Sequence, residues 1–238
     1  MDDRYPFSTL RFPSPARPLL GLTVLLVEDS RFASEAMRLL CMRSGARIRR
    51  ADCLRSARRH LQVYRPSVLI VDLGLPDGSG IELIDEAHAA SPRIGVILGI
   101  SADDHARGMC LAAGADGFLE KPLQSLNIFQ AEILRHLPAD RQPSGPRRLQ
   151  DEVVCPDSIA YRDDMAHIAS LLGSGEDAGV LDYVTRFLEG VAVLAGDRAL
   201  LEANRALRHA HDSGQPLCSD LATLAGLLQE RLADRVAI

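Results

Sequence analysis

The amino-acid sequence predicts an α/β fold, a doubly wound parallel sheet of five strands, followed by an all-α region of four helices. Short apolar runs alternate with helical patterns through residues 21–137. This alternation is typical of parallel strands joined by right-handed crossovers, with helices on both faces. A proline-rich stretch then breaks the pattern at residues 138–156. From Asp157 onward the apolar residues recur at helical spacing, which indicates helices that pack on one another.

The stretch Ser67–Gly80 is the one around which the first half is organised. Val68–Val71 are continuous aliphatic residues, Asp72 follows at once, and a loop rich in Gly and Pro comes next. A continuous apolar run bounded by turn signals indicates a strand buried on both faces. A carboxylate at the carboxyl end of such a strand lies where open α/β sheets bind their ligands. We therefore expect a chemical role for Asp72.

The other elements of the first half follow the same alternation. The apolar run Leu22–Val27 ends in Glu28 and Asp29, and it leads into a helix that Ser30 caps and Gly45 ends. The later expected elements are an edge strand at 47–51 with alternating arginines, helices at 54–64 and 81–90, a strand at 93–100, a helix at 103–113, a strand at 117–120, and a helix at 123–137.

The second half reads as four helices joined by short connections. Glycine-containing breaks separate the expected helices, which are Ser158–Leu172, Glu176–Ala195, Asp197–Ser213 and Leu217–Asp234. Leucines at 221, 224, 228 and 232 mark one buried face of the last helix. Short connections favour an antiparallel bundle. We expect a flexible arm at residues 1–20, an α/β domain at 21–137, a linker at 138–156 and an acidic bundle at 157–238.

Carboxyl strand ends bring five polar residues of the first half together: Glu28, Asp29, Asp72, Ser101 and Lys121. Three converging acids repel each other, and a hard divalent cation such as Mg²⁺ resolves this because it prefers carboxylate oxygens. The Lys121 ammonium and the Ser101 hydroxyl suit phosphoryl oxygens. These are the parts of an acyl-phosphate site in which Asp72 attacks phosphorus.

Each of these residues also has a structural explanation. Asp72 could cap the loop after its strand, Glu28 and Asp29 could favour the start of the next helix, and Ser101 could be an N-cap. Lys121 could be a solvated charge, but it is the only lysine in a chain that otherwise uses arginine. A lone lysine indicates a site that a planar guanidinium does not serve.

Residues 22–137 resemble the receiver domain of two-component response regulators. The resemblance rests on four separated motifs, Leu26-Val27-Glu28-Asp29-Ser30, Val71-Asp72-Leu73-Gly74-Leu75-Pro76 with Gly80, Ser101-Ala102 and Lys121-Pro122. It implies a flavodoxin-like sheet of strand order 2-1-3-4-5 and phosphorylation of Asp72 by a phosphohistidine. It also implies Mg²⁺ held by Glu28, Asp29, Asp72 and the Gly74 backbone carbonyl, with Ser101 and Phe118 as switch residues.

Three positions depart from the family pattern. Gly74 and Leu75 stand where the family usually has a larger residue and a methionine, and Ser101 stands where threonine is more frequent. Gly74 leaves the neighbourhood of the phosphoryl group without a side chain, so access of water or a phosphatase to it could differ. No required group is lost, and we expect a competent phosphoacceptor. Phe118 could equally be a simple core aromatic.

The helical half carries no recognisable catalytic signature. Residues 151–238 hold fifteen acids and seven arginines, a balance that argues against nucleic-acid binding there. Three histidines, His167, His209 and His211, invite a phosphotransfer interpretation, but each lacks the His-x-Leu-Lys-Gly pattern of those domains. The helix from Leu217 has Arg231 as its one cation before Asp234, which does not suit a DNA-recognition helix.

We therefore expect a cytoplasmic two-component response regulator that is not an enzyme. A sensor histidine kinase or phosphotransferase would phosphorylate Asp72, and the helical domain would contact a downstream protein, with a homodimer as a further option. The alternatives are a DNA-binding transcriptional regulator and a phosphorelay intermediate with a degenerate phosphotransfer domain. No run of apolar residues is long enough to span a membrane. The five scattered cysteines, without a CxxC pair, suit a reducing cytoplasm and buried apolar positions.

Overall fold

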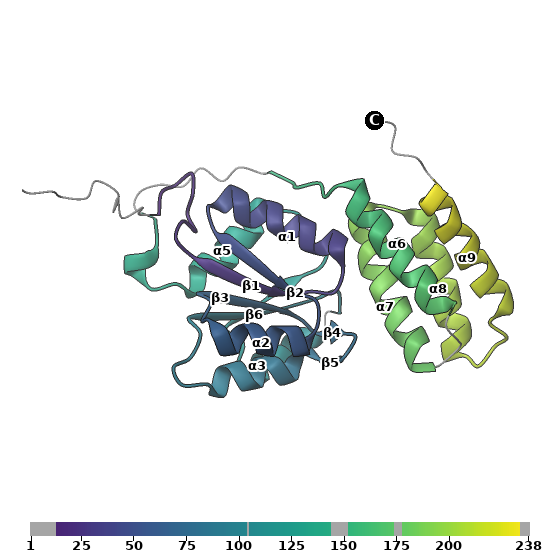
Figure 1. The fold of residues 1–238 in the computed structure, drawn as a ribbon, viewed down its shortest axis with the longest axis horizontal. Helices are drawn as coiled ribbons and strands as arrows, with labels where there is room; N and C mark the ends of the chain where they lie inside the picture. The colour runs from purple at the N-terminus through teal and green to yellow at the C-terminus, as the bar shows by residue number, and fades with distance from the viewer. Residues whose placement is uncertain (1–12, 104, 144–151, 174–177, 234–238) are drawn as a thin grey trace, which may run out of the picture.

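The computed structural model describes residues 13–103, 105–143, 152–173 and 178–233. Figure 1 shows two parts side by side, an α/β part with helices above and below a sheet, and a group of four helices, α6 to α9. The predicted fold class is confirmed in both parts. Among the described residues, no helix is both long enough and apolar enough to cross a membrane.

The α/β part is built on a sheet of parallel strands. They are β1 (Thr23–Val27), β2 (Arg47–Ala51), β3 (Val68–Asp72), β6 (Val96–Ser101) and β7 (Gly117–Glu120). Their spatial order is β2-β1-β3-β6-β7, which is the predicted order 2-1-3-4-5 when these strands are counted along the chain. Val27 lies opposite Val71, and Asp72 lies opposite Ile100. The carboxyl ends of neighbouring strands therefore meet at one edge of the sheet.

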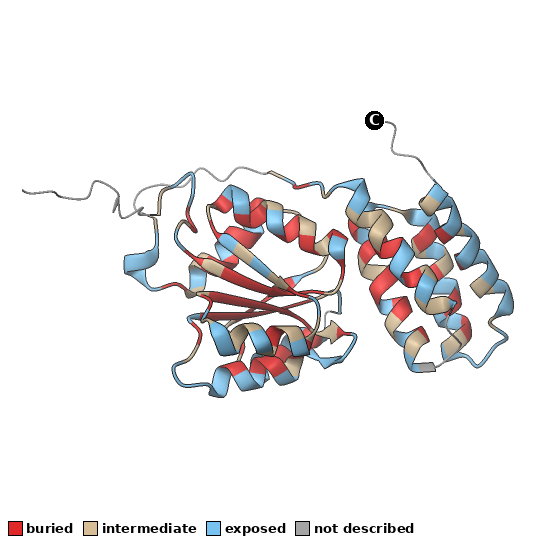
Figure 2. Ribbon diagram, in the orientation of Figure 1, coloured by how far each residue is buried: buried red, intermediate tan, exposed pale blue. Residues whose placement is uncertain are grey.

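Helices cover both faces of the sheet. The helices on one face are α1 (Arg31–Ser44) and α5 (Leu126–His136), and those on the other are α2 (Leu54–Val63), α3 (Gly80–Ala89) and α4 (Ala106–Ala112). Alternate residues of β1 serve the two layers, because successive side chains of a strand point to opposite faces. Val24 and Leu26 pack with α1 and α5, whereas Leu25 and Val27 pack with the other layer. Figure 2 shows the strands buried between the layers.

Helix α1 begins and ends where the sequence predicts. The Ser30 hydroxyl accepts a hydrogen bond from the Ala33 backbone N–H at 2.9 Å. Gly45 follows the helix at φ 85°, and its N–H bonds to the last carbonyls. Glycine adopts this left-handed conformation without a Cβ penalty. The start of α1 is therefore set at the end of β1, next to Glu28 and Asp29.

Several elements of the α/β part differ from expectation, including α5, which starts at Leu126 rather than Leu123. Strand β6 starts at Val96 rather than Arg93, whose guanidinium instead donates to Asp116 Oδ1 at 2.9 Å. Helix α4 starts at Ala106, because the Asp103 carboxylate accepts from the His105 N–H and holds a turn before the helix. The short antiparallel pair β4 (Gly74–Leu75) and β5 (Gly78–Ser79) was not expected. Two-residue strands carry too little periodicity to be read from sequence.

Part of the stretch expected to be a linker packs on the α/β part. Val154 is buried, and its N–H donates to the Gln124 carbonyl at 3.0 Å. The Glu152 carbonyl accepts from the Leu126 N–H, and the Glu152 side chain pairs with Arg43. Ala139–Arg141 forms one turn of 3₁₀ helix. Residues 152–154 therefore belong structurally to the start of α5.

The second part consists of α6 (Ser158–Leu172), α7 (Ala178–Ala195), α8 (Arg198–Asp212) and α9 (Cys218–Ala233). Consecutive helices pack on one another, and α9 returns to pack on α6. Ile168, Val184, Leu207 and Leu224 are fully buried. Of the four leucines predicted to form the buried face of α9, Leu224 and Leu228 are buried and Leu221 and Leu232 are half-buried. We call α6 to α9 the helical region.

Asp197 connects three helices of the helical region. Its carboxylate accepts hydrogen bonds from Tyr161 Oη at 2.7 Å and from Arg231 Nε at 2.7 Å. It also caps α8, because Oδ1 accepts from the Leu200 N–H at 3.1 Å. The hydrogen bonds from Arg231 and Tyr161 outweigh burial and lower the pKa of Asp197 to about 2. One ionised side chain therefore joins α6, α8 and α9.

Replacing Asp197 by asparagine should lower the free energy of unfolding of the helical region by about 1–2 kcal/mol near neutral pH. The folded-state pKa lies below the ordinary value of 3.8, so the stabilisation is present above that value. It is lost as the pH falls towards the folded-state pKa. Urea unfolding monitored by far-ultraviolet circular dichroism should therefore give a penalty that shrinks below about pH 4. The matched control is Glu202→Gln on the exposed face of α8. An equal penalty at all pH values would contradict the assignment.

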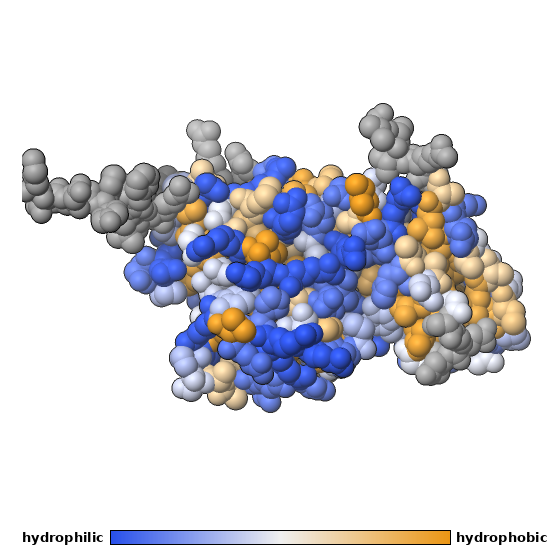
Figure 3. Space-filling model, viewed as in Figure 1, coloured by the Kyte–Doolittle hydropathy of each residue, from blue (hydrophilic) through white to orange (hydrophobic). Residues whose placement is uncertain are grey.

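Strand β2 lies at the edge of the sheet, as its alternating arginines predict. Arg47 and Arg49 are exposed, and Arg49 stacks over the Tyr64 ring at 5.0 Å. Figure 3 shows hydrophilic side chains across the face formed by β2 and α2. Charged side chains on an edge strand discourage pairing with other chains.

The cysteines agree only in part with expectation. Cys41 and Cys110 are buried, but Cys155 and Cys218 are exposed. The exposed pair occupies the approach to α6 and the start of α9, where the buried faces of the helices are already provided by leucine and isoleucine.

Candidate functional site

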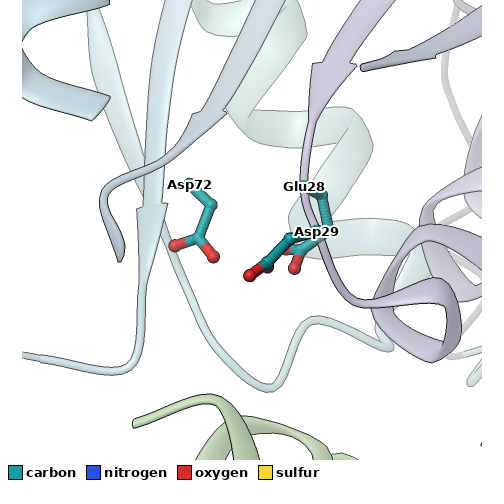
Figure 4. A group of neighbouring side chains, drawn as sticks. All are labelled: Glu28, Asp29 and Asp72. Atoms are coloured by element: carbon teal, nitrogen blue, oxygen red, sulfur yellow. The ribbon is translucent and has the colours of Figure 1, made fainter. Parts of the chain in front are cut away.

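Three carboxylates meet at the carboxyl edge of the sheet, where β1 and β3 end (Figure 4). Glu28 and Asp29 follow β1, and Asp72 is the last residue of β3. One oxygen from each side chain lies within 4.8 Å of those from the other two. Because β1 and β3 are neighbours in the sheet, their ends lie about 5 Å apart. The strand order by itself produces the convergence.

Lys121 lies among these acids. It follows β7, and its Nζ is 2.7 Å from Glu28 Oε2 and 2.9 Å from Asp72 Oδ2. Burial alone would lower the pKa of Lys121, but the charges of Asp72 and Glu28 outweigh burial and raise it. The Lys121 side chain therefore stays protonated, and its ammonium group holds together the carboxylates of Glu28 and Asp72 at the ends of the neighbouring strands β1 and β3.

The acids remain under-compensated by a single cation. Burial, together with the nearby charges of Asp72 and Asp29, raises the pKa of Glu28 to about 8 despite the opposing effect of Lys121. Burial and the Asp72 charge likewise raise the pKa of Asp29. Like charges that are taken out of water disfavour the ionised form in this way. The site therefore has capacity for further positive charge.

The donor set fits a hard divalent cation. All three acids offer carboxylate oxygens, the ligands that Mg²⁺ prefers, and Mg²⁺ is often held by one or two carboxylates and otherwise by water and substrate phosphate. A bound dication favours the ionised forms of Glu28 and Asp29 and so relieves the burial effect that raises their pKa values. Asp72, Asp29 and Glu28 are the residues that would hold it.

The remaining residues singled out in the sequence lie around Asp72. The Ser101 hydroxyl, at the end of β6, accepts from the Asp103 N–H at 3.1 Å, so it orders the following turn. The Gly74 N–H donates to Asp72 Oδ1 at 3.3 Å. A Cβ at Gly74 would meet nothing within 4 Å, so the space beside the carboxylate is open. Phe118 is buried in the layer of α3 and α4.

The helical region contributes a side chain to the acid cluster. Tyr183 of α7 donates from its hydroxyl to Asp29 Oδ2 at 2.6 Å, while the Ser30 N–H donates to Oδ1 at 3.0 Å. Both oxygens of Asp29 are therefore engaged. The sequence gives no signal for this contact, because Tyr183 lies 154 positions away and falls in no motif. Only the packing of α7 against the sheet edge reveals it.

A cavity of about 680 Å³ lies over the acid cluster, between the two parts of the chain. Asp72, Ser101 and Lys121 belong to one wall. Phe187 and Gly190 of α7 belong to the other, together with arginines of α7 and α8. The cavity is large enough for a small molecule of the size that proteins commonly bind.

The three histidines lie apart from this cavity. His167 is exposed in the middle of α6, with its ring 5.9 Å from the Phe187 ring. His209 is exposed near the end of α8, and His211 is half-buried there, 3.7 Å from Asp182. Among the described residues that line the cavity, none is one of these three. None of these three histidines therefore lies beside Asp72 in the cavity.

Comparison with known proteins finds similarity in the α/β part. The family model described as "Response regulator receiver domain" matches residues 24–132. The KDP operon transcriptional regulatory protein KdpE of Escherichia coli is 33% identical over 99 residues, which span 42% of this chain and 44% of KdpE. The transcriptional regulatory protein CitB of Klebsiella pneumoniae is 36% identical over 108 residues, spanning 43% of this chain and 45% of CitB. The matched segments thus make up less than half of each relative.

Solved structures are also similar to part of this chain. The chemotaxis protein CheY4 of Vibrio cholerae covers 49% of this chain and 98% of its own length, at 24% identity and a TM-score of 0.45. A receiver domain of a signal transduction histidine kinase from Syntrophus aciditrophicus covers 53% of this chain and 98% of its own length, also at 24% identity, with a TM-score of 0.46.

Proposed function

Residues 24–132 are a response regulator receiver domain, and on that premise we propose that Asp72 is its phosphoacceptor and that the helical region is a protein-interaction output domain. The chain then acts as a signalling regulator of a two-component system rather than as an enzyme. The division into a receiver at residues 21–137, a connection at 138–156 and a helical domain from residue 157 belongs to the same proposal, as does a cytoplasmic location.

The observation that carries the proposal is the position of Lys121. Its ammonium bridges Asp72 and Glu28 across two strand ends, at the edge where a phosphoryl group on Asp72 would present its oxygens. A compact ammonium with rotatable donors can exchange a carboxylate oxygen for a phosphoryl oxygen. A structural ion pair would need only one acid, whereas here one lysine contacts two acids of a cluster of three.

The reaction proposed for Asp72 is an in-line displacement. A carboxylate oxygen of Asp72 attacks the phosphorus of a phosphohistidine, the phosphorus–nitrogen bond breaks, and the electron pair stays on a ring that carries a proton on its other nitrogen. Neutral imidazole leaves, and an aspartyl phosphate remains. Lys121 and the Ser101 hydroxyl would then donate to the phosphoryl oxygens. Phe118, buried beside β6, would report this change together with Ser101.

Receiver domains bind Mg²⁺ at an acidic pocket, and Glu28, Asp29, Asp72 and the Gly74 carbonyl would hold it in this chain. When bound, Mg²⁺ neutralises the charge that develops on the transferring phosphoryl group. Asp29 is kept in place by the Ser30 N–H and the Tyr183 hydroxyl. Hydrogen bonds to ligating carboxylates generally orient them.

The donor would be a sensor histidine kinase or phosphotransferase, and the output would pass through the helical region to another protein. The acidic balance of that region supports a protein rather than a nucleic-acid partner. Arg231 of α9 is already engaged by Asp197, which leaves no cation on the described part of that helix for a phosphate backbone.

The test is incubation of the full chain with acetyl phosphate and Mg²⁺, followed by peptide mass spectrometry. We expect one modified peptide, with the added phosphate on Asp72 and released by hydroxylamine. Omission of Mg²⁺ should reduce the labelling. Modification at another residue, or no labelling under any donor concentration, would overturn the proposed function.

A further inference from the structure

Helix α7 lies across the acceptor edge of the receiver. Near its start, Tyr183 bonds to Asp29 after β1 at 2.6 Å. At its end, the Leu194 carbonyl accepts from Gln124 Nε2, after β7, at 3.1 Å. Strands β3 and β6 lie between β1 and β7 in the sheet, so α7 passes over Asp72. Figure 1 agrees, with α6 and α7 as the helices of the bundle that lie on the side of the receiver.

A second helix fixes this arrangement at α1. The Asp164 carboxylate of α6 accepts from the Ser30 hydroxyl at 2.6 Å, the Arg31 N–H at 2.8 Å and the Phe32 N–H at 3.0 Å. Asp164 is only 2% exposed, and the unsatisfied N–H groups of a helix N-terminus are a favourable environment for a carboxylate. Asp163 adds an ion pair with Arg31 at 2.7 Å. The docking of the helical region is therefore specific.

A glycine of α7 borders the space between this helix and Asp72. Gly190 lies within α7 and lines the cavity over the acid cluster. A Cβ at this position would meet nothing within 4 Å, so packing does not require glycine there. Glycine inside a helix costs roughly 0.5–1 kcal/mol relative to alanine. Glycine at this position therefore does not stabilise α7, but it leaves the cavity next to Asp72 open.

We infer that α7 determines which phosphodonors reach Asp72, with Gly190 as the residue that sets their size. This inference rests on the proposed function of Asp72. With the helical region docked, the cavity of about 680 Å³ admits a small acyl phosphate. A phosphohistidine carried on another folded protein requires α7 to move away. Displacement of α7 would simultaneously expose Tyr183 and Asp164, which ties donor access to the release of the helical region.

The reaction with a small donor is balanced without further reagents. An Asp72 carboxylate oxygen attacks the phosphorus of acetyl phosphate, and the bond from phosphorus to the acetyl oxygen breaks. The electron pair leaves with acetate, so one carboxylate and one acyl phosphate are consumed and one of each is formed. No proton has to be moved.

The experiment compares labelling rates of full-length variants by acetyl phosphate and by a phosphotransfer domain phosphorylated on its histidine, both with Mg²⁺. Gly190→Phe should lower the acetyl phosphate rate by about tenfold or more, because the ring fills the cavity. Gly226→Phe is the matched control, since Gly226 of α9 is exposed and its Cβ would also meet open space. Its rate should remain that of the unaltered chain.

Releasing the helical region from the receiver should reverse the loss of labelling rate caused by Gly190→Phe. Adding Asp164→Ala and Gln124→Ala to Gly190→Phe should restore the acetyl phosphate rate, because the contacts that hold α6 and α7 on the receiver are then lost and α7 no longer covers Asp72. The same two changes without Gly190→Phe should raise the rate with the phosphorylated phosphotransfer domain relative to acetyl phosphate by about tenfold. Measuring this ratio needs no substitution at Gly190. It therefore tests the role of α7 even where circular dichroism shows that Gly190→Phe has unfolded α7.

Different results would contradict the proposed phosphoacceptor role of Asp72 and the proposed role of α7. No labelling of the unaltered chain by acetyl phosphate would contradict the phosphoacceptor role of Asp72. Labelling that is insensitive to Gly190→Phe in a folded bundle, or a ratio between the two donors that undocking leaves unchanged, would overturn the role of α7 alone.

Discussion

Replacing Asp72 by asparagine should reduce phosphorylation by acetyl phosphate to background. The carboxamide has nearly the same shape as the carboxylate, but it lacks a nucleophilic oxygen anion, so no acyl phosphate can form. The loss should amount to roughly a thousandfold or more in initial rate. Mass spectrometry of the intact chain after incubation with the donor and Mg²⁺ measures it.

The change should leave the fold intact, because Glu28 remains as an ion-pair partner of Lys121 at 2.7 Å. Asp85→Asn is the matched control, because Asp85 is exposed on α3. The Asp85→Asn variant should be labelled at the rate of the unaltered chain. Unchanged labelling of the Asp72→Asn variant would remove the basis of the proposed function. Loss of labelling in both variants would point to a general effect of the substitutions instead.

Replacing Lys121 by methionine should impair both stability and phosphorylation. Methionine keeps the length of the side chain but leaves Glu28 and Asp72 without their cation in a site that is largely buried. Breaking a buried ion pair by removing one partner costs about 3–5 kcal/mol. Loss of a donor to the phosphoryl oxygens should lower the labelling rate by about 100-fold or more. Urea unfolding and labelling kinetics measure the two effects.

The stability penalty should depend on pH in a defined direction. Without Lys121 the folded-state pKa of Glu28 should rise above its value of about 8. An acid whose folded-state pKa is raised loses stability as the pH rises from its unfolded value, near 4.5, towards the folded one. The penalty of Lys121→Met should therefore be larger near pH 8 than near pH 5.

Two further variants separate charge from geometry at this position. Lys121→Arg retains the positive charge and should recover most of the stability, but its planar fork should recover less of the labelling rate. Arg55→Met, on the exposed face of α2, should change neither quantity. A Lys121→Met protein that is as stable as the unaltered chain at every pH would contradict the ion-pair geometry.

The sequence alone determined the sheet and the residues at its carboxyl edge, and the resemblance to receiver domains implied the strand order. Asp72, Glu28, Asp29, Ser101 and Lys121 each follow an apolar run, and parallel strands place such residues on one edge whatever the details of the loops. The limits of α1 were equally readable, because Ser30 and Gly45 are local capping signals. These predictions held because short-range patterns and strand direction are enough to define them.

The ends of helices and strands that depend on turns were harder to predict from the sequence. The start of α4 at Ala106 reflects a hydrogen bond from the His105 N–H to the Asp103 carboxylate. Residues 152–154 pack at the start of α5 although their neighbourhood reads as a linker. Proline and arginine near a segment describe its local preferences, whereas its packing depends on a surface formed by distant residues.

Only the tertiary structure decided how the two parts of the chain meet. Helical periodicity shows that α6 and α7 each have an apolar face, but it does not identify which polar groups of the receiver face them. Asp164 at the N-terminus of α1, Tyr183 on Asp29 and Gly190 over the cavity are separated from their partners by more than a hundred positions. Such contacts depend on the relative placement of finished elements, and no local pattern encodes that placement. The sequence therefore identified the proposed acceptor, and the tertiary structure identified what covers it.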